Sequence, residues 1–239
     1  MKIEIYPRKI LILLLYLILF LLFANITGII SKFYFNHGQV YGLVPLFDFN
    51  TEANIPTFYS SLALISCSIL LAFIFLAHKR QGSSYKSWRG LSIIFLFLSI
   101  DEIATIHEWV NDPIQQLLNT SGLLYFAWII PYGLALLLLL GIYLKFLINL
   151  PKKFLHLFII SGVIFISGAI GIESFCGWYC ELLGGIHGLD NLLYSVFYTG
   201  EEFLEMLGIV FFIYTLLSYI VTELNYSTIS ITNKEKSII

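Results

Sequence analysis

Two groups of ionisable residues interrupt apolar stretches of this chain. The first is carried by Ser99–Glu108, which reads Ser-Ile-Asp-Glu-Ile-Ala-Thr-Ile-His-Glu, and the second by Gly200–Glu205, which reads Gly-Glu-Glu-Phe-Leu-Glu. A charged side chain near the centre of a bilayer costs roughly 2.5–3.5 kcal/mol on insertion scales, so these residues are not expected to face lipid. Both groups therefore predict a polar site inside the protein or along a water-filled cavity.

The chemistry of this site depends on what neutralises its carboxylates. No Lys or Arg lies in the interior of any predicted span, and like charges at close range cannot all ionise. Either some carboxyls stay protonated, as in a proton relay, or a cation sits among them. Carboxylate and imidazole ligands fit Zn, Fe or Mn, so a divalent metal cation is one of the two expected solutions.

Known metal motifs do not identify the cation. Helical-bundle di-metal sites pair Glu with a Glu-x-x-His motif, and one class of zinc peptidases carries His-Glu-x-x-His. Neither pattern occurs in this sequence, where His107 follows Glu102 by five residues. The metal hypothesis rests on composition rather than on a motif.

The site residues are expected at two depths, counted from the span ends at about 1.5 Å per residue. The predicted middle level holds Asp101, Glu102, Glu201, Glu202 and Glu205. The predicted outer level holds His107, Glu108 and Glu173, beside His187 and Asp190 in the following loop.

These residues are assigned catalytic and metal-binding roles as follows. The residues expected to act as ligands, proton carriers or an acid/base pair in catalysis are Asp101, Glu102, His107, Glu108, Glu201 and Glu202. The predicted metal ligands are Glu102, His107, Glu108, Glu173, Glu201, Glu202 and Glu205.

Membrane-spanning helices must position these side chains. The chain has 239 residues, of which 59% are hydrophobic and 12% charged, whereas a soluble domain carries about 25% charged residues. Six apolar stretches are long enough to cross about 30 Å of hydrocarbon, and they lie near residues 10–30, 57–77, 90–110, 124–148, 155–175 and 191–220. The sequence thus predicts an all-α, polytopic bundle of six transmembrane helices in a single domain, residues 1–239.

The basic residues predict the orientation of this bundle. They gather in alternate connections and in the tail, at Lys79, Arg80, Lys86, Arg89, Lys152, Lys153, Lys234 and Lys236. Because Lys and Arg are enriched in cytoplasmic loops, both termini are expected in the cytoplasm, in a bacterial plasma (inner) membrane. Cys176 and Cys180 would then face the oxidising outer side, and the sequence leaves open whether they form a disulfide.

Three functions fit these features. The leading hypothesis is a metal-dependent intramembrane enzyme that acts on a lipophilic substrate. The alternative is a proton- or cation-coupled transporter or channel that uses the same carboxylates, and the third is a structural subunit of a membrane complex. The expected partners are the lipid bilayer and a lipophilic small molecule or cation. No nucleic-acid partner is expected, because the chain has a net charge of -2 and no basic stripe.

Overall fold

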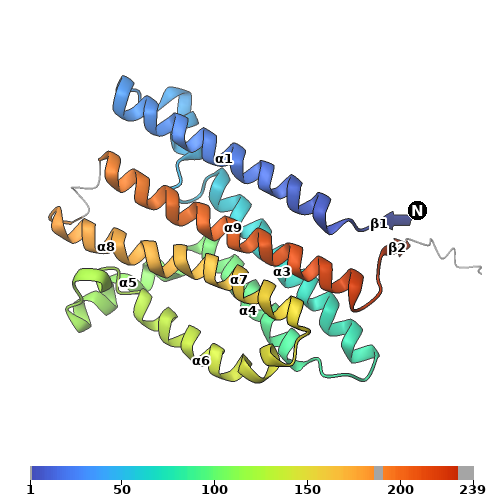
Figure 1. Ribbon diagram of the computed structural model, residues 1–239. Coiled ribbons are helices and arrows are strands. Elements are labelled where there is room, and N and C mark those ends of the chain that lie inside the picture. Colours follow the sequence, from blue (N-terminus) through green and yellow to red (C-terminus); the bar gives the residue numbers. More distant parts are fainter. Residues whose placement is uncertain (1, 186–190, 231–239) are drawn as a thin grey trace, which may run out of the picture.

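The computed structural model describes residues 2–185 and 191–230, which are largely helical (Figure 1). The helices are α1 (Pro7–Phe35), α2 (Leu43–Phe47), α3 (Ile55–Arg80), α4 (Lys86–Ala104), α5 (Ile106–Leu118), α6 (Ile129–Ile148), α7 (Lys152–Ile166), α8 (Glu173–Leu182) and α9 (Leu192–Thr222). A π-helix, Ser167–Ile172, joins α7 to α8, and two 3-10 turns cover Val40–Gly42 and Gly122–Leu124. Two short strands, β1 (Lys2–Glu4) and β2 (Thr228–Ser230), complete the described chain.

Five helical segments are long and apolar enough to cross a membrane. They are α1, α3, α6, the continuous Lys152–Leu182 segment and α9, and a sixth is obtained if α4 and α5 are counted as one span bent by 79°. The prediction of an all-α protein with several membrane-spanning helices is therefore confirmed.

The two strands pair with each other and bring the ends of the described chain together. They are antiparallel, with Lys2 opposite Ser230 and Glu4 opposite Thr228, and they lie at one end of the bundle (Figure 1). Because β1 precedes the first span and β2 follows the last, the chain between them crosses the bundle an even number of times. This pairing favours counting the bent α4–α5 pair as a crossing.

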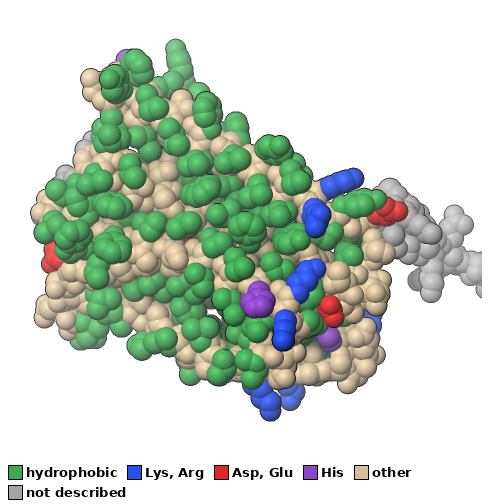
Figure 2. Space-filling model, in the orientation of Figure 1, with side chains coloured by type: hydrophobic (Ala, Val, Ile, Leu, Met, Phe, Trp, Pro, Cys, Tyr) green, Lys and Arg blue, Asp and Glu red, His purple; other side chains and the backbone are tan. Residues whose placement is uncertain are grey.

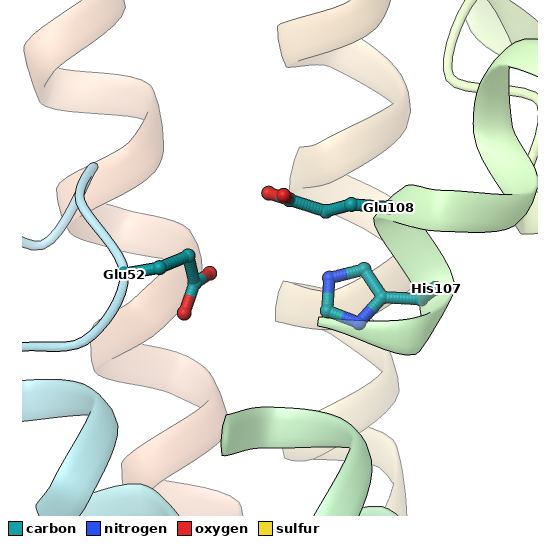
Figure 3. A group of neighbouring side chains, drawn as sticks. All are labelled: Glu52, His107 and Glu108. Atoms are coloured by element: carbon teal, nitrogen blue, oxygen red, sulfur yellow. The ribbon is translucent and has the colours of Figure 1, made fainter. Parts of the chain in front are cut away.

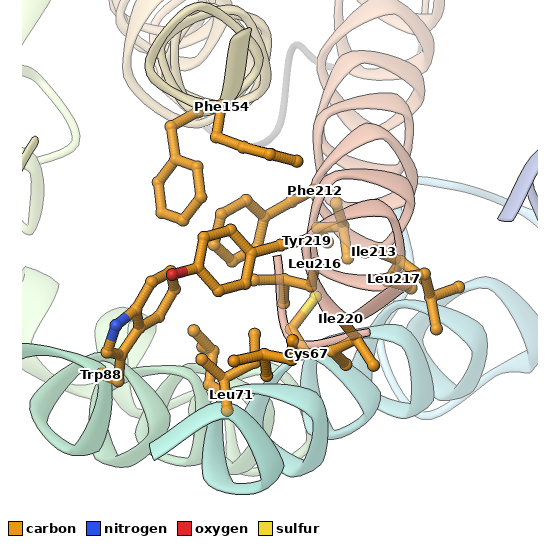
Figure 4. Close-up of a cluster of buried hydrophobic side chains, with 14 of the residues drawn as sticks. Cys67, Leu71, Trp88, Phe154, Phe212, Ile213, Leu216, Leu217, Tyr219 and Ile220 are labelled. Carbon is orange, nitrogen blue, oxygen red and sulfur yellow. The ribbon is translucent and has the colours of Figure 1, made fainter. Parts of the chain in front are cut away.

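Helix α9 occupies the centre of the bundle and packs against α1, α3 and α7. Its second half belongs to a large apolar cluster, in which Leu216 is fully buried and Tyr219 lies against Trp88 at a ring distance of 4.8 Å (Figure 4). Lipid tails are as apolar as these side chains, so helix association here depends on close packing rather than on the hydrophobic effect.

Reciprocal serine contacts fix α4 against α3. The Ser61 hydroxyl donates to the Ser99 carbonyl at 2.8 Å, and the Ser99 hydroxyl donates to the Ser61 carbonyl at 3.0 Å. Ser68 and Ser92 repeat this exchange at 2.7 and 2.9 Å. Small polar residues of this kind allow two helices to approach closely in a membrane, and here they anchor α4 just before Asp101.

The helix breaks at Thr105, immediately after α4. Thr105 has φ 49° and ψ 39°, a left-handed conformation that is rare for a β-branched residue and costs of order 1–3 kcal/mol. The Asp101 carboxylate accepts a hydrogen bond from the His107 amide at 2.9 Å, which satisfies one of the backbone donors freed by the break. The expectation of one continuous helix through residues 90–110 is wrong, because Asp101 caps a second helix that starts at Ile106.

Candidate metal centre

Three side chains from two separate segments converge beside the break. His107 and Glu108 lie in the first turn of α5, and Glu52 faces them from the loop before α3 (Figure 3). One ligand atom from each residue lies within 4.8 Å of the other two. We call these three residues the candidate metal centre, since two carboxylates and one imidazole form a ligand set suited to Zn, Fe or Mn.

Asp101 orients the imidazole of this centre. Its Oδ2 atom lies 3.4 Å from Nδ1 of His107 and accepts a hydrogen bond from the Tyr132 hydroxyl at 3.1 Å. With Nδ1 directed to Asp101, the other ring nitrogen lies on the side of Glu52 and Glu108 (Figure 3). Metal-binding histidines characteristically donate their second ring N–H to a carboxylate, which fixes the tautomer and the ring orientation.

A hydrogen-bonded loop holds Glu52 in place. The Asn54 side chain donates to the Asp48 carbonyl at 2.6 Å and closes the loop on itself. The buried Asn25 of α1 accepts from the Phe49 amide at 3.0 Å and ties the loop to the bundle. A supported segment of this kind holds the Glu52 carboxyl in a defined position beside α5.

The electrostatic surroundings of Glu52 favour a cation. The residue is exposed as a whole, but its carboxyl points toward Glu108 and His107 (Figure 3). Burial raises the pKa of this carboxyl above its usual value, and the negative charge of Glu108 raises it further, whereas His107 lowers it. A metal ion would relieve the repulsion between the two carboxylates and favour their ionised forms.

A second acidic group lies next to the candidate metal centre. Ligand atoms of Glu173, Cys176 and Glu201 lie within 4.8 Å of one another. The Cys176 thiol donates to the Glu201 carboxylate at 3.5 Å. Trp128 links this group to the metal centre, because its indole N–H donates to Glu173 at 3.3 Å while its ring lies 5.1 Å from that of His107.

The π-helix before α8 brings the second group together. Gly168 lies in this π-helix, and a Cβ atom placed there would stand 2.6 Å from the Glu201 carbonyl oxygen. The missing side chain therefore lets the α7–α8 segment approach α9 at the position of Glu201. π-helical turns within α-helices occur frequently at functional sites.

The structure distributes the predicted site residues unevenly. It brings His107 together with Glu108, and Glu173 together with Glu201, whereas Asp101 supports His107 instead of joining either group. The predicted ligands outside both groups are Glu102, Glu202 and Glu205. They are half-buried, and their carboxyls interact electrostatically with one another and with Glu52.

The predicted division into a middle and an outer level does not hold. The break at Thr105 turns His107 back to Asp101, although they were expected at different depths. The fifth span continues to Leu182, so Glu173 lies well inside this helix and meets Glu201. His187 and Asp190 lie outside the described residues.

Several residues of the site were not predicted. Glu52 is the main omission. Trp128 and Tyr132 were missed because aromatic residues are common in membrane helices and their spacing carries no signal. Cys176 was considered only as a partner of Cys180, and the structure has both cysteines free and buried, with Cys176 bonded to Glu201.

Both groups fall within one family match. A family model described as a domain of unknown function, DUF8692, matches residues 10–219. No curated protein and no solved structure matches the chain. Because the match covers most of the sequence, including every residue of the two groups, the chain belongs to the DUF8692 family.

Proposed function

We propose that this protein is a metal-dependent membrane enzyme whose cation is held by Glu52, His107 and Glu108. The observation that carries the proposal is the contact between Asp101 and Nδ1 of His107. Beside it, ligand atoms of His107 and of two carboxylates lie within 4.8 Å of one another. A histidine with only a packing role does not require a carboxylate at Nδ1. It also does not require two further carboxylates beside its other ring nitrogen.

The number of protein ligands supports catalysis more than a structural role. Structural zinc sites use four protein ligands, whereas catalytic sites use three and leave a position for water or substrate. Glu52, His107 and Glu108 supply three. A cation held by these residues would lower the pKa of a bound water and polarise a carbonyl or phosphoryl oxygen.

The second acidic group supports acid–base chemistry beside the cation. Ligand atoms of Glu173 and Glu201 lie within 4.8 Å of each other, and two carboxyls at this distance favour a state in which one of them keeps its proton. Trp128 contacts both Glu173 and His107, so this proton lies one side chain away from the metal centre. A carboxyl pair that holds a proton at this place is suited to protonate a leaving group.

A lipophilic substrate is supported by the surroundings of α5. This helix carries His107 and Glu108 but exposes the apolar side chains Trp109, Leu117 and Leu118, of which Trp109 is 78% exposed. A helix with one polar and one apolar face lies at a membrane interface with the apolar face toward the acyl chains. Substrate would then reach the centre from the lipid.

The distribution of charge supports a centre near the outer surface of a bacterial plasma membrane. Glu52 precedes α3, whereas Lys79 and Arg80 end the same helix at the opposite face of the bundle. The positive-inside rule assigns the basic end to the cytoplasm, together with the two termini.

The metal content of the purified protein tests this proposal. We expect stoichiometric Zn, Fe or Mn by mass spectrometry in the wild type, and loss of that metal in Glu52→Gln and Glu108→Gln. Asp112→Asn serves as the matched control, because Asp112 is an exposed carboxylate on the same helix outside the centre. Thermal unfolding in detergent would establish that all four proteins are folded.

Two results would overturn the proposal. The first is wild-type protein that, purified without chelator, contains no metal and binds none on titration. The second is a metal content that is the same in Glu52→Gln, Glu108→Gln and the wild type.

A proton- or cation-coupled transporter is the second candidate. The observation in its favour is the electrostatic link from Glu52 through Glu102 to Glu202 and Glu205, which extends the acidic region along α9. Ion flux into liposomes that depends on Glu202 would favour this function, whereas a metal-dependent turnover without flux would favour the enzyme.

A further inference from the structure

A groove of about 410 Å³ lies far from the acidic site, between the start of α1, the start of α7 and the end of α9. Three of its lining residues are cations, namely Arg8 and Lys9 from α1 and Lys153 from α7. Figure 2 shows that Lys and Arg side chains of the visible face gather at this end of the molecule, beside the short strands. The groove therefore concentrates positive charge at one end of the bundle.

The lining has the polarity of an anion site. None of the described residues that line it is an Asp or a Glu. Glu4 is close in sequence, but it accepts a hydrogen bond from the Tyr6 hydroxyl and is not part of the lining. Tyr214 and Ser218 of α9 add hydroxyl groups to the lining.

The backbone adds to the positive charge of the groove. α1 begins at Pro7 and α7 begins at Lys152, so two helix N-termini meet at the same end. Helix N-termini present free amide groups and the positive end of the helix dipole, which favour a bound anion. Together with the three cations, this arrangement suits a phosphate group.

The position of the groove favours a membrane lipid as the molecule that carries the phosphate. It opens at the ends of three membrane-spanning segments, and its wall includes apolar groups such as Val221 beside the hydroxyls. A free phosphate ion makes no favourable contact with apolar groups, whereas the acyl chains of a phospholipid pack against them. Basic pockets between membrane helices on the cytoplasmic side bind anionic lipid head groups.

We propose that this groove binds the phosphate head group of an anionic phospholipid, with Arg8, Lys9 and Lys153 as the cations that contact it. Tyr214 and Ser218 donate hydrogen bonds to the same head group. This site is separate from the metal centre and does not depend on the function proposed for it.

Lipid titration followed by native mass spectrometry tests the proposal. Delipidated protein in detergent is titrated with phosphatidylglycerol and with phosphatidylcholine of the same acyl chains. We expect the wild type to retain phosphatidylglycerol preferentially. The combined Arg8→Gln, Lys9→Gln and Lys153→Gln substitutions should weaken that binding about a hundredfold, and Lys153→Gln alone about fivefold.

A matched control removes the same charge elsewhere at this end of the bundle. Lys79→Gln, Arg80→Gln and Lys86→Gln lie on α3 and α4 outside the groove, and this combination should keep the preference for phosphatidylglycerol. Thermal unfolding without added lipid checks that each variant is folded, and Lys153→Gln remains informative if the triple substitution is not.

Three results would overturn the proposal. The wild type could bind the two lipids equally. The control combination could lose as much affinity as the groove combination. Inorganic phosphate could displace phosphatidylglycerol at concentrations comparable to those of the lipid, which would identify a site for free phosphate instead.

Discussion

Asp101 serves two structural purposes at the scale of a single residue. One carboxylate oxygen caps the first turn of α5 through the His107 amide, and the other lies against Nδ1 of the same histidine. Asp101 is also buried, with only 5% of its surface exposed. The residue that stabilises the break therefore also orients the histidine of the candidate metal centre.

Replacing Asp101 by Asn separates these two purposes. The amide oxygen of Asn still accepts from the His107 backbone, but the amide nitrogen cannot accept from the imidazole N–H. We expect the affinity for metal to fall about 10–100-fold, as is typical when a carboxylate behind a ligating histidine is removed. Competition of chelator-stripped protein with a metal-sensitive dye measures this affinity.

The control for this experiment is Asp112→Asn, which should bind metal as the wild type does. Circular dichroism should give the same helix content for Asp101→Asn and the wild type. An unchanged metal affinity in Asp101→Asn would contradict the orienting role of Asp101.

The sequence alone could group candidate site residues only where they are close together in the chain. His107 and Glu108 are adjacent, and their charge marks them within an apolar stretch. Glu52 belongs to a polar loop, where an acidic residue is unremarkable. Its approach to His107 depends on hydrogen bonds of Asn25 and Asn54 that no periodicity reveals.

At the scale of elements, a glycine on each side allows the α7–α8 segment to approach α9, namely Gly168 and, on α9, Gly208, where an added Cβ atom would stand 2.7 Å from the Phe165 amide nitrogen. A Cβ atom at Gly168 would overlap the Glu201 carbonyl oxygen of α9 at 2.6 Å. Gly162 on α7 offers a comparison, because a Cβ atom there would have no neighbour within 4 Å.

We expect Gly168→Ala to destabilise the protein by about 1–3 kcal/mol, the usual cost of overpacking. Gly162→Ala should leave the stability unchanged or raise it slightly, since Ala favours a helix over Gly by about 1 kcal/mol. Thermal unfolding of the two variants in detergent measures the difference. Equal midpoints would argue against the close approach of these helices.

The elements were predictable where a long apolar stretch defines them. Each predicted span other than the third corresponds to one membrane-length helix, although the fourth starts later, at Ile129. The break at Thr105 was missed because neither Pro nor Gly marks it, and its stability depends on Asp101. The π-helix was missed although it contains Gly168 and Gly171, because small residues are also common in closely packed α-helices of membrane proteins.

At the scale of the whole molecule, the paired strands and the basic end predict a topology. The α3–α4 connection should lie in the cytoplasm and the α5–α6 connection outside. Cysteines introduced at the exposed positions Ser84 and Ser121 report on these two connections, while the native Cys67, Cys176 and Cys180 are buried.

A membrane-impermeant maleimide should label Ser121→Cys in intact cells, and Ser84→Cys only after the membrane is permeabilised. The protein without either substitution serves as the control for the native cysteines. Labelling of both positions from the same side would contradict six crossings and place the bent α4–α5 pair in a re-entrant loop.

The central position of α9 has a consequence for biogenesis. The helix against which α1, α3 and α7 pack is the last of the described helices to leave the ribosome. In a two-stage view of membrane protein folding, helices insert first and associate afterwards. The earlier helices are therefore inserted in the bilayer before their main packing partner is available. Any quality-control step that recognises unassembled spans would act during this interval.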